Sequence, residues 1–370
     1  MRPGSEAELA EAVRGAAGPL VVRGGGTRGV GRPVTGEVLE TSGVAGITLY
    51  EPGALTLVAG AGTPMAEIEA ALAAERQRLP FEPGDMRGLL GTSGESTIGG
   101  VVAANASGPR RVQAGACRDS LIGVRFVDGA GNVVKNGGRV MKNVTGYDLV
   151  KLMAGSWGTL GVLSEVSFKV LPVPATQATV LVRGVALTDA AAAMAAAVGS
   201  PFEVSGAAWS EADGVMLRIE GFAASVSYRA GRLRELLRRF GEIEVEGDAE
   251  AVAARWRAVR DVGAFAGRVG DVWRVSVKPS DAAGIVARMG PEAVLLDWAG
   301  GLIWALVATG TDLRARIGAF QGHATLMRAA PEVRARIAPF QPEAAAVAAL
   351  AAGLRAKFDP RGILNPGLMD

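Results

Sequence analysis

Hydrophobic residues recur at two spacings in the first part of the chain, one typical of helices and one typical of strands. Ser5 and Glu8 form a capping box that predicts a helix over 5–15. The apolar run 20–22 predicts a short strand, and the run 55–59 predicts another. Helices and strands are therefore expected to be mixed from the start of the chain.

The region up to residue 172 continues in the same manner. Thr63 and Pro64 are expected to be the N-cap and the first residue of a helix with one apolar face. The apolar stretches 121–127 and 132–135 flank the sequence Asp-Gly-Ala-Gly, which predicts a hairpin. Apolar and polar residues alternate over 162–170, so this stretch predicts a strand with one buried face.

The part that follows contains the same series of elements twice. Each series reads strand, helix, strand, strand, helix, strand, and a helix near 249–259 separates the two. This order predicts two ferredoxin-like halves side by side. The predicted elements are strands 178–183, 203–209, 214–220 and 241–246 with helices 188–198 and 225–239, then strands 272–277, 293–298, 302–307 and 323–327 with helices 280–288 and 311–317.

Two prolines, Pro172 and Pro174, mark a boundary between these regions. A helix over 342–357 then leads to a rigid tail at 358–367, which is expected to dock on another part of the protein. A chain of 370 residues is too long for one ordinary core. We therefore expect an α+β protein in three parts, at 1–172, 173–340 and 341–370.

Composition excludes several classes of function. The formal net charge is +2 and no block of basic residues occurs, so nucleic acid is not an expected partner. The single cysteine, Cys117, excludes an intrachain disulfide, and the single histidine, His323, excludes a multi-histidine metal site within the chain. Acidic residues at the start do not fit a signal peptide, and 295–310 reads as two strands, so a cytoplasmic location is expected.

Glycine-rich segments carry the candidate chemistry. In 91–111, small residues expose backbone N–H groups, and Thr97 is expected to cap a short helix, a combination that favours a phosphate. A tight loop packed under another element is the alternative. Residues 24–29 match G-x-G-x-x-G, but Pro33 follows too closely for the helix that a Rossmann fingerprint requires. An anion-binding loop fits better than a plain turn, and 155–161 forms a third glycine-rich loop.

Together these segments resemble the FAD-binding domain of the vanillyl-alcohol oxidase / p-cresol methylhydroxylase (PCMH) superfamily. Within it, the chain is similar to the FAD-binding subunits of bacterial glycolate oxidases, particularly in GPRR, VMKNVTGYDL and GHATLMR. The resemblance implies a PCMH-type FAD-binding domain of two α+β subdomains, a duplicated cap domain and a C-terminal segment that returns to the FAD domain. The matching segments are 21–29, 97–111, 115–131, 140–172 and 358–367.

The resemblance also implies which residues contact FAD. Thr27 stands where some relatives attach the flavin through a histidine, so FAD is expected to bind noncovalently. Cys117 is expected to be a packed thiol and not a second attachment point. The implied FAD-binding residues are Arg23, Gly24, Gly25, Gly26, Thr27, Arg28, Thr97, Ile98, Gly99, Gly100, Ala104, Ser107, Gly108, Gly158, Gly161, Val162 and Asn365.

Catalytic residues are not assigned by the sequence. Relatives that oxidise 2-hydroxy acids use several histidines to hold a metal and accept a proton, whereas this chain has only His323. That histidine is either a general base or a structural residue at the start of a strand. Arg110, Arg111 and Arg118 either pair with a substrate carboxylate, or hold FAD phosphates or a partner subunit. Lys142, Tyr147 and Asp148 form a polar group beside the flavin or only order their loop.

Two functions remain open. In the first, the chain is an FAD-carrying subunit that docks on a catalytic flavoprotein paralogue and helps to pass electrons from a small 2-hydroxy acid such as glycolate toward an iron–sulfur subunit. In the second, it is a self-sufficient FAD-dependent 2-hydroxy-acid dehydrogenase. The intact set of FAD motifs beside the missing histidines favours the first. The sequence leaves open whether the complex associates peripherally with the inner face of the cytoplasmic membrane.

Overall fold

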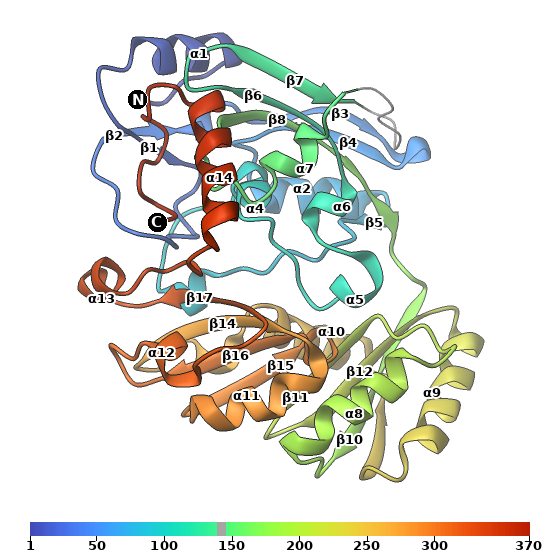
Figure 1. Ribbon diagram of the computed structural model, residues 1–370. Helices are drawn as coiled ribbons and strands as arrows, with labels where there is room; N and C mark the ends of the chain where they lie inside the picture. The colour runs from blue at the N-terminus through green and yellow to red at the C-terminus, as the bar shows by residue number, and fades with distance from the viewer. Residues whose placement is uncertain (139–145) are drawn as a thin grey trace.

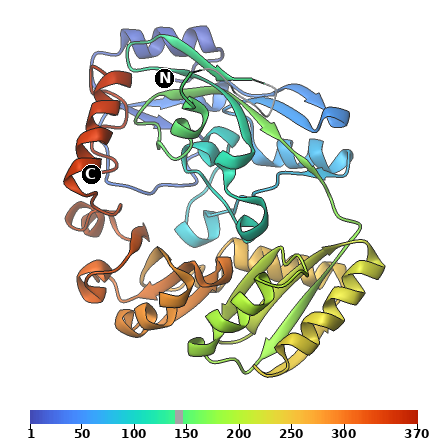
Figure 2. The same ribbon diagram turned by 45° about the vertical axis from the view of Figure 1, so that its right-hand side comes forward.

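The computed structural model describes residues 1–138 and 146–370. Lys142 and most of the VMKNVTGYDL segment therefore lie outside the described residues. The chain forms two layers, one built mainly from its first 172 residues and one from the region that follows, and its last segment returns to the first layer (Figures 1 and 2). In the described part of the chain, no helix has the length and apolar character that a membrane span needs.

The first layer is organised on a five-stranded sheet with the order β3-β4-β8-β6-β7, in which all neighbours are antiparallel. The predicted hairpin is confirmed, and so is the strand at 162–170, but the prediction of one buried face is wrong, because six of the eight residues of this strand are buried and they lie on both of its faces. The strands are β3 (Ile47–Glu51), β4 (Thr56–Gly60), β6 (Leu121–Val127), β7 (Val133–Gly137) and β8 (Val162–Lys169).

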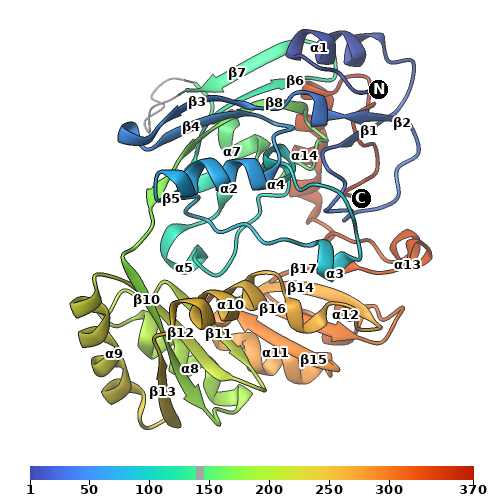
Figure 3. The same ribbon diagram turned by 180° about the vertical axis from the view of Figure 1, so that it is seen from behind.

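Short helices pack on the face of this sheet that is turned toward the second layer (Figure 3). They are α2 (Met65–Ala74), α4 (Ile98–Ala103), α6 (Cys117–Ser120) and α7 (Leu149–Met153). The predicted start of α2 was wrong by one residue, because Pro64 is the N-cap. The hydroxyl of Thr63 instead donates to the Gly60 carbonyl at 2.7 Å and accepts the Gly46 N–H at 2.9 Å, which fixes the turn before the helix.

A smaller core lies at one end of the sheet. Helix α1 (Glu6–Gly15) begins at Ser5, whose hydroxyl caps the Glu8 N–H as predicted. It packs with the parallel pair β1 (Leu20–Arg23) and β2 (Glu37–Glu40) and with Ile363 and Leu364 of the C-terminal tail. The tail thus completes a core that begins at the N-terminus.

The second layer is one antiparallel eight-stranded sheet with the order β13-β10-β12-β11-β15-β16-β14-β17. The predicted series of elements is confirmed twice, and the second strands of the two halves, β11 and β15, pair to join them. The elements are β10 (Thr176–Arg183), α8 (Leu187–Val198), β11 (Gly206–Ser210), β12 (Gly214–Gly221), α9 (Ala223–Leu237) and β13 (Glu242–Glu246), then β14 (Asp271–Val277), α11 (Ala282–Met289), β15 (Ala293–Asp297), β16 (Leu302–Val307), α12 (Leu313–Ile317) and β17 (Gly322–Arg328).

The two faces of this sheet have different neighbours. Helices α8, α9, α11 and α12 cover the outer face, where side chains such as Trp273 and Val275 are buried. The inner face carries the alternate positions of the same strands, and α10 (Ala249–Arg260) and α3 (Arg87–Leu90) pack against it. Residues Val272, Arg274 and Ser276 of β14 therefore face the first layer.

The end of the chain returns from the second layer to the first. After β17, α13 (Pro331–Arg336) and α14 (Ala345–Phe358) lead to a tail in which Leu364 pairs with Leu20 of β1. Figure 1 shows α14 lying beside the first layer, with both chain termini at the same end of the molecule. The remaining short elements are β5 (Gln77–Arg78) and β9 (Leu171–Pro172), which pair, and α5 (Arg111–Ala114).

Candidate functional site

The loop after β1 and the loop before α4 lie directly against each other. A Cβ atom placed on Gly25 would be 1.5 Å from the Glu95 carbonyl oxygen, and one on Gly24 would be 2.4 Å from Oγ1 of Thr97. Only residues without a side chain permit this contact. The two glycine-rich segments singled out in the sequence therefore form one surface made of backbone.

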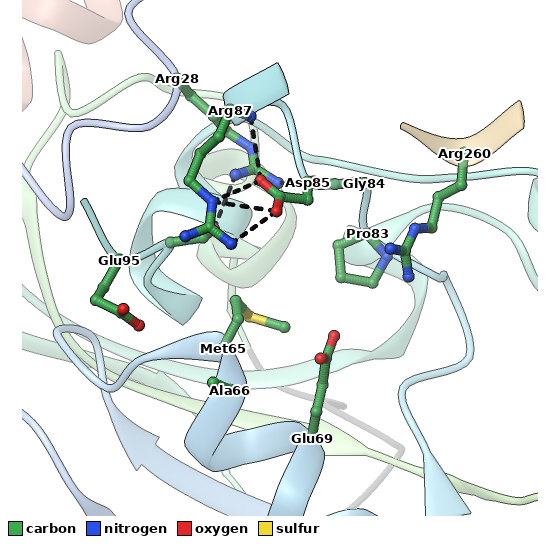
Figure 4. Close-up of a pocket in the computed structure, with 11 residues that line it drawn as sticks. Arg28, Met65, Ala66, Glu69, Pro83, Gly84, Asp85, Arg87, Glu95 and Arg260 are labelled. Atoms are coloured by element: carbon green, nitrogen blue, oxygen red, sulfur yellow. Dashed lines mark hydrogen bonds and ion pairs between the residues drawn. The ribbon is translucent and has the colours of Figure 1, made fainter. Parts of the chain in front are cut away.

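Arg28 fixes the position of these two loops. Its guanidinium donates to Oγ of Ser96 at 2.9 Å and to the Gly84 carbonyl at 2.5 Å. Burial lowers its pKa to about 10, so it stays charged at neutral pH. Figure 4 shows Arg28 beside a cavity of about 130 Å³, next to the Asp85–Arg87 ion pair. The Arg28 side chain thus orders the loops, while the side chain of Arg23 is exposed.

The tail brings the third loop to the same place. Oδ1 of Asn365 accepts the Val22 N–H, and its Nδ2 donates to the Trp157 carbonyl, both at 2.8 Å. A Cβ atom placed on Gly158 would be 3.0 Å from Nδ2 of Asn365. The Trp157 N–H donates to Ala103 at the end of α4. A buried Asn365 therefore joins β1, α4 and the loop at 155–161, as a residue that orders a cofactor site would.

Several polar groups in this region have no hydrogen-bond partner among the described residues and are available to a ligand. In the described part of the chain, the backbone N–H groups of residues 25–29 have no protein acceptor. Oγ of Ser156, in the third loop, is buried without a hydrogen-bond partner. A second cavity, of about 470 Å³, reaches Thr159 and Asn365. Convergent N–H groups bind phosphate oxygens, so the residues fit a dinucleotide with two phosphates.

Several other residues that the resemblance implied to contact FAD take part in helix capping or in packing. Thr97 caps α4 by accepting the Gly100 N–H at 3.3 Å. A Cβ on Gly99 would be 2.7 Å from Ala61, and one on Gly161 would be 2.6 Å from Phe126. Ile98 and Val162 are fully buried, Gly26 lies at a positive φ of 71°, and Ala104 ends α4.

Cys117 is a packed thiol. Its side chain is fully buried in the core beneath the five-stranded sheet. Burial raises the pKa of this thiol well above its usual range, so it does not ionise at neutral pH. An un-ionised, buried sulfur is a poor nucleophile, which agrees with the expectation that it does not attach the flavin.

Arg110, which was expected to bind a substrate carboxylate, a phosphate or a partner, is instead committed to ion pairs within the chain. It pairs with Glu82 at 2.9 Å and with Glu220 at 2.6 Å. Arg218 pairs with Glu82 at 2.9 Å, and Arg78 pairs with Glu220 at 2.8 Å. Burial disfavours the Glu220 carboxylate, but the surrounding arginines outweigh this and lower its pKa. We call these five residues the interlayer network, because they join the two layers.

This network was not predicted from the sequence. The sequence pattern that indicates such a network is a charged residue within a largely apolar strand, as at Arg218 in GVMLRIEG. Arg218 is 1% exposed, and its guanidinium lies 4.5 Å from the centre of the Trp256 ring. Arg274 in DVWRVSV has the same pattern and was also missed.

The remaining candidates are His323, Arg118, Asp148 and Tyr147. His323 begins β17 on the inner face, and in the described part of the chain its imidazole makes no hydrogen bond. Its side chain is exposed, and partial desolvation together with the charges of Arg274 and Arg111 lowers its pKa from the ordinary value. Arg118 is half exposed and lies 3.9 Å from Asp119. Asp148 caps α7, and Tyr147 is exposed.

Asp297, also on the inner face, is expected to make stability depend on pH. It is 2% exposed, and burial raises its pKa to about 7, although the Trp298 N–H donates to Oδ1 at 2.7 Å. Between pH 4 and 7 the folded state retains a proton that the unfolded state loses, so the free energy of unfolding falls as pH rises. Asp297→Asn keeps the acceptor and is expected to be more stable than wild type by about 2–3 kcal/mol at pH 8.

Urea unfolding at pH 8 and pH 4.5 measures this difference. At pH 4.5 the folded carboxyl is still protonated, and the pH lies less than one unit above the ordinary pKa of 3.8 of the unfolded carboxyl, so the gain should shrink to about 1 kcal/mol or less. An Asn variant that is less stable than wild type at pH 8 would contradict the assignment of a neutralised buried carboxyl.

Comparisons with known proteins agree with the geometry of the loops. A family model described as an FAD binding domain matches residues 1–137. Glycolate oxidase subunit GlcE of Escherichia coli (strain K12) is 37% identical over 355 residues, which cover 95% of this chain and 92% of that protein. Glycolate oxidase subunit GlcD of Bacillus subtilis (strain 168) is 32% identical over 175 residues, 44% of this chain and 34% of that protein.

A solved structure supports the fold alone. Alkyldihydroxyacetonephosphate synthase matches with a TM-score of 0.69 at 15% identity, over 99% of this chain and 76% of that chain. The loops and these matches define an FAD-dependent oxidoreductase with a mixed α/β fold. The likeness to GlcE over nearly the whole of both proteins is specific, and the chain belongs to the family of that glycolate oxidase subunit.

Proposed function

We propose that the chain is the FAD-carrying subunit of a glycolate or similar 2-hydroxy-acid oxidase complex and that it holds FAD noncovalently. The observation that carries the proposal is the contact of the glycine-rich loops through Gly25 and Asn365, beside backbone N–H groups at 25–29 that have no acceptor among the described residues. The absence of an imidazole at position 27 and the buried, protonated Cys117 support noncovalent binding.

In this function the chain's own residues bind and orient the cofactor. Bound FAD would supply the redox chemistry that helps to pass electrons from the substrate toward the iron–sulfur subunit. The N–H groups of residues 25–29 would bind the diphosphate, while Arg28 and Asn365 hold the loops in place. The inner face of the eight-stranded sheet would cover the flavin side of the site, with His323 as the one imidazole near it.

We infer the partners from the names of the relatives and from the single histidine of the chain. The names of GlcE and GlcD place both relatives in glycolate oxidases. A chain with one histidine lacks the several imidazoles that assisted proton abstraction uses in catalytic relatives. We propose a GlcD-like flavoprotein as the catalytic partner and an iron–sulfur subunit as the acceptor of electrons, in a cytoplasmic complex with peripheral contact to the membrane.

We further propose the division into an FAD domain at 1–172, a cap at 173–340 and a docking segment at 341–370. The alternative function, a self-sufficient dehydrogenase, is favoured by one observation: a neutral His323 on the inner face, where it would be able to accept a proton.

Anaerobic addition of glycolate to the FAD-loaded chain distinguishes the two. We expect the flavin absorption to persist with the chain alone and to bleach when the GlcD-like and iron–sulfur subunits are added. Rapid bleaching of the chain alone would support the alternative. Denaturation with acid should release all FAD, and a flavin mass that stays with the polypeptide would contradict noncovalent binding.

A further inference from the structure

We propose that Arg111 and Arg274 together bind the carboxylate of a small acid at the boundary between the two layers. The identity of that acid as a 2-hydroxy acid rests on the proposed function, whereas the carboxylate site itself rests on the geometry that follows.

Two guanidinium groups share one indole ring in this place. The guanidinium carbon of Arg111 lies 4.4 Å from the centre of the Trp298 ring, and that of Arg274 lies 5.0 Å from it. Arg111 comes from α5 of the first layer and Arg274 from β14 of the second. Two like charges beside one ring repel each other unless an anion lies near both.

No carboxylate of the chain fills that role. Among the described residues, neither arginine has a carboxylate oxygen within 4 Å, and 139–145 contains no acidic residue. The guanidinium of Arg111 donates to Oγ of Ser107 at 2.9 Å, and that of Arg274 donates to no described residue. The arginines of the interlayer network, by contrast, each pair with Glu82 or Glu220.

The charged groups around the pair do not neutralise it. Burial, then Arg111, lower the pKa of Arg274 to about 10, so it remains charged at neutral pH. Asp297 is the acid whose charge acts on Arg274, but it is itself partly protonated near pH 7 and its Oδ1 accepts the Trp298 N–H. Arg118 and Asp119 act on Arg111 with opposite signs. An unpaired positive charge remains.

The position of the pair suits a substrate of the flavin. Nε1 of Trp298 donates to the Gly108 carbonyl at 3.0 Å, directly beside Ser107. Ser107 and Gly108 are among the residues that the resemblance to PCMH-type proteins implied to contact FAD. On the sheet, Ser276 pairs with His323, so Arg274 occupies the next inward position along β14. His323 is close enough to Arg274 and Arg111 for their charges to act on its imidazole.

A planar carboxylate matches the forked guanidinium better than a point-charge ligand does. Free phosphate and an acidic side chain of a partner subunit also carry anionic oxygens that guanidinium groups bind. The test below separates these sources, and it uses the fact that His323 is the only histidine of the chain.

The imidazole nitrogen signals of His323 in the ¹⁵N-labelled, FAD-loaded chain report its pKa. The probe is oxamate, a two-carbon carboxylate without an oxidisable hydroxyl, at constant ionic strength. Since Arg274 and Arg111 lower the pKa of His323, an anion bound between them should raise it. We expect a rise of about one pH unit with saturable dependence on oxamate.

Arg274→Gln should abolish this rise. Arg239→Gln is the matched control, because Arg239 also lies over an aromatic ring, 4.7 Å from the centre of Phe240, on the outer helix side. That variant should respond as wild type does. Flavin absorption of each sample shows whether FAD is bound, so failure of the proposed cofactor function is seen separately. Arg111→Lys, which keeps a charge, should retain part of the rise and guards against misfolding of the Gln variant.

Four outcomes would overturn the proposal. They are no rise in the FAD-loaded wild type, an equal rise in Arg274→Gln, an equal rise with inorganic phosphate, and a rise on adding the GlcD-like subunit alone after which oxamate has no effect. The third would assign the pair to phosphate, and the fourth would assign it to an acidic side chain of the partner.

Discussion

Glu82→Gln is expected to lower the free energy of unfolding by about 3–5 kcal/mol at pH 7, because it breaks a buried ion pair on one side only. The Glu82 carboxylate accepts two hydrogen bonds from Arg218, each at 2.9 Å, and pairs with Arg110 at 2.9 Å. Without that charge, Arg218 keeps only a distant carboxylate, Glu220, at 3.9 Å. A nearly uncompensated cation would then be buried between the layers.

Guanidinium chloride unfolding, followed by both tryptophan and flavin fluorescence, measures this change. Glu211→Gln is the control, since Glu211 is exposed on the turn between β11 and β12 and makes no ion pair among the described residues. It should change stability by less than about 0.5 kcal/mol. A loss below about 1 kcal/mol for Glu82→Gln would mean that the interlayer network is not a stabilising contact.

The effect should also depend on pH. Burial opposes ionisation of Glu82, but Arg218 and Arg110 outweigh it and lower its pKa. A carboxylate with a lowered pKa contributes stability above the unfolded value near 4.5, and this contribution is lost as pH falls through the folded value. The difference between wild type and Glu82→Gln should therefore narrow below about pH 4.

Gly25→Ala is expected to weaken FAD binding by at least about 100-fold, which corresponds to about 2.7 kcal/mol. The new methyl group would lie 1.5 Å from the Glu95 carbonyl oxygen, a backbone atom that has no side-chain freedom to move away. One of the two loops must shift, and the N–H groups of residues 25–29 would be displaced with it. Overpacking of this kind costs free energy even where the fold survives.

Gly29→Ala is the control for this substitution. It lies in the same loop, its Cβ would meet no atom within 4 Å, and its φ is not positive. Titration of the apoprotein with FAD, followed by quenching of flavin fluorescence, should show wild-type affinity for Gly29→Ala. Wild-type affinity for Gly25→Ala would contradict the position of the diphosphate at this loop.

Several features could be predicted from local sequence because they depend on local physics. The Ser5 cap and the two hydrophobic periods set the elements, and the repeated series after residue 173 was read correctly. The glycines at 24, 25 and 158 marked places where backbone must come close to something, and the structure shows what. The error at Thr63 and Pro64 arose because the Thr63 hydroxyl bonds to a turn and to Gly46 instead of to the helix.

By itself, the sequence determined the order of elements, the loops suited to FAD and the shortage of imidazoles, because periodicity, glycine content and composition belong to the chain alone. Only the tertiary structure decided which charges meet. Arg110 pairs with Glu82 and Glu220, whereas Arg274 lies beside Arg111 with no acid near both among the described residues, although more than 100 residues separate Arg110 from Glu220 and Arg111 from Arg274 along the chain. The reason is physical: the charge state and role of an arginine depend on burial and on the faces that pack together, and no local pattern contains that information.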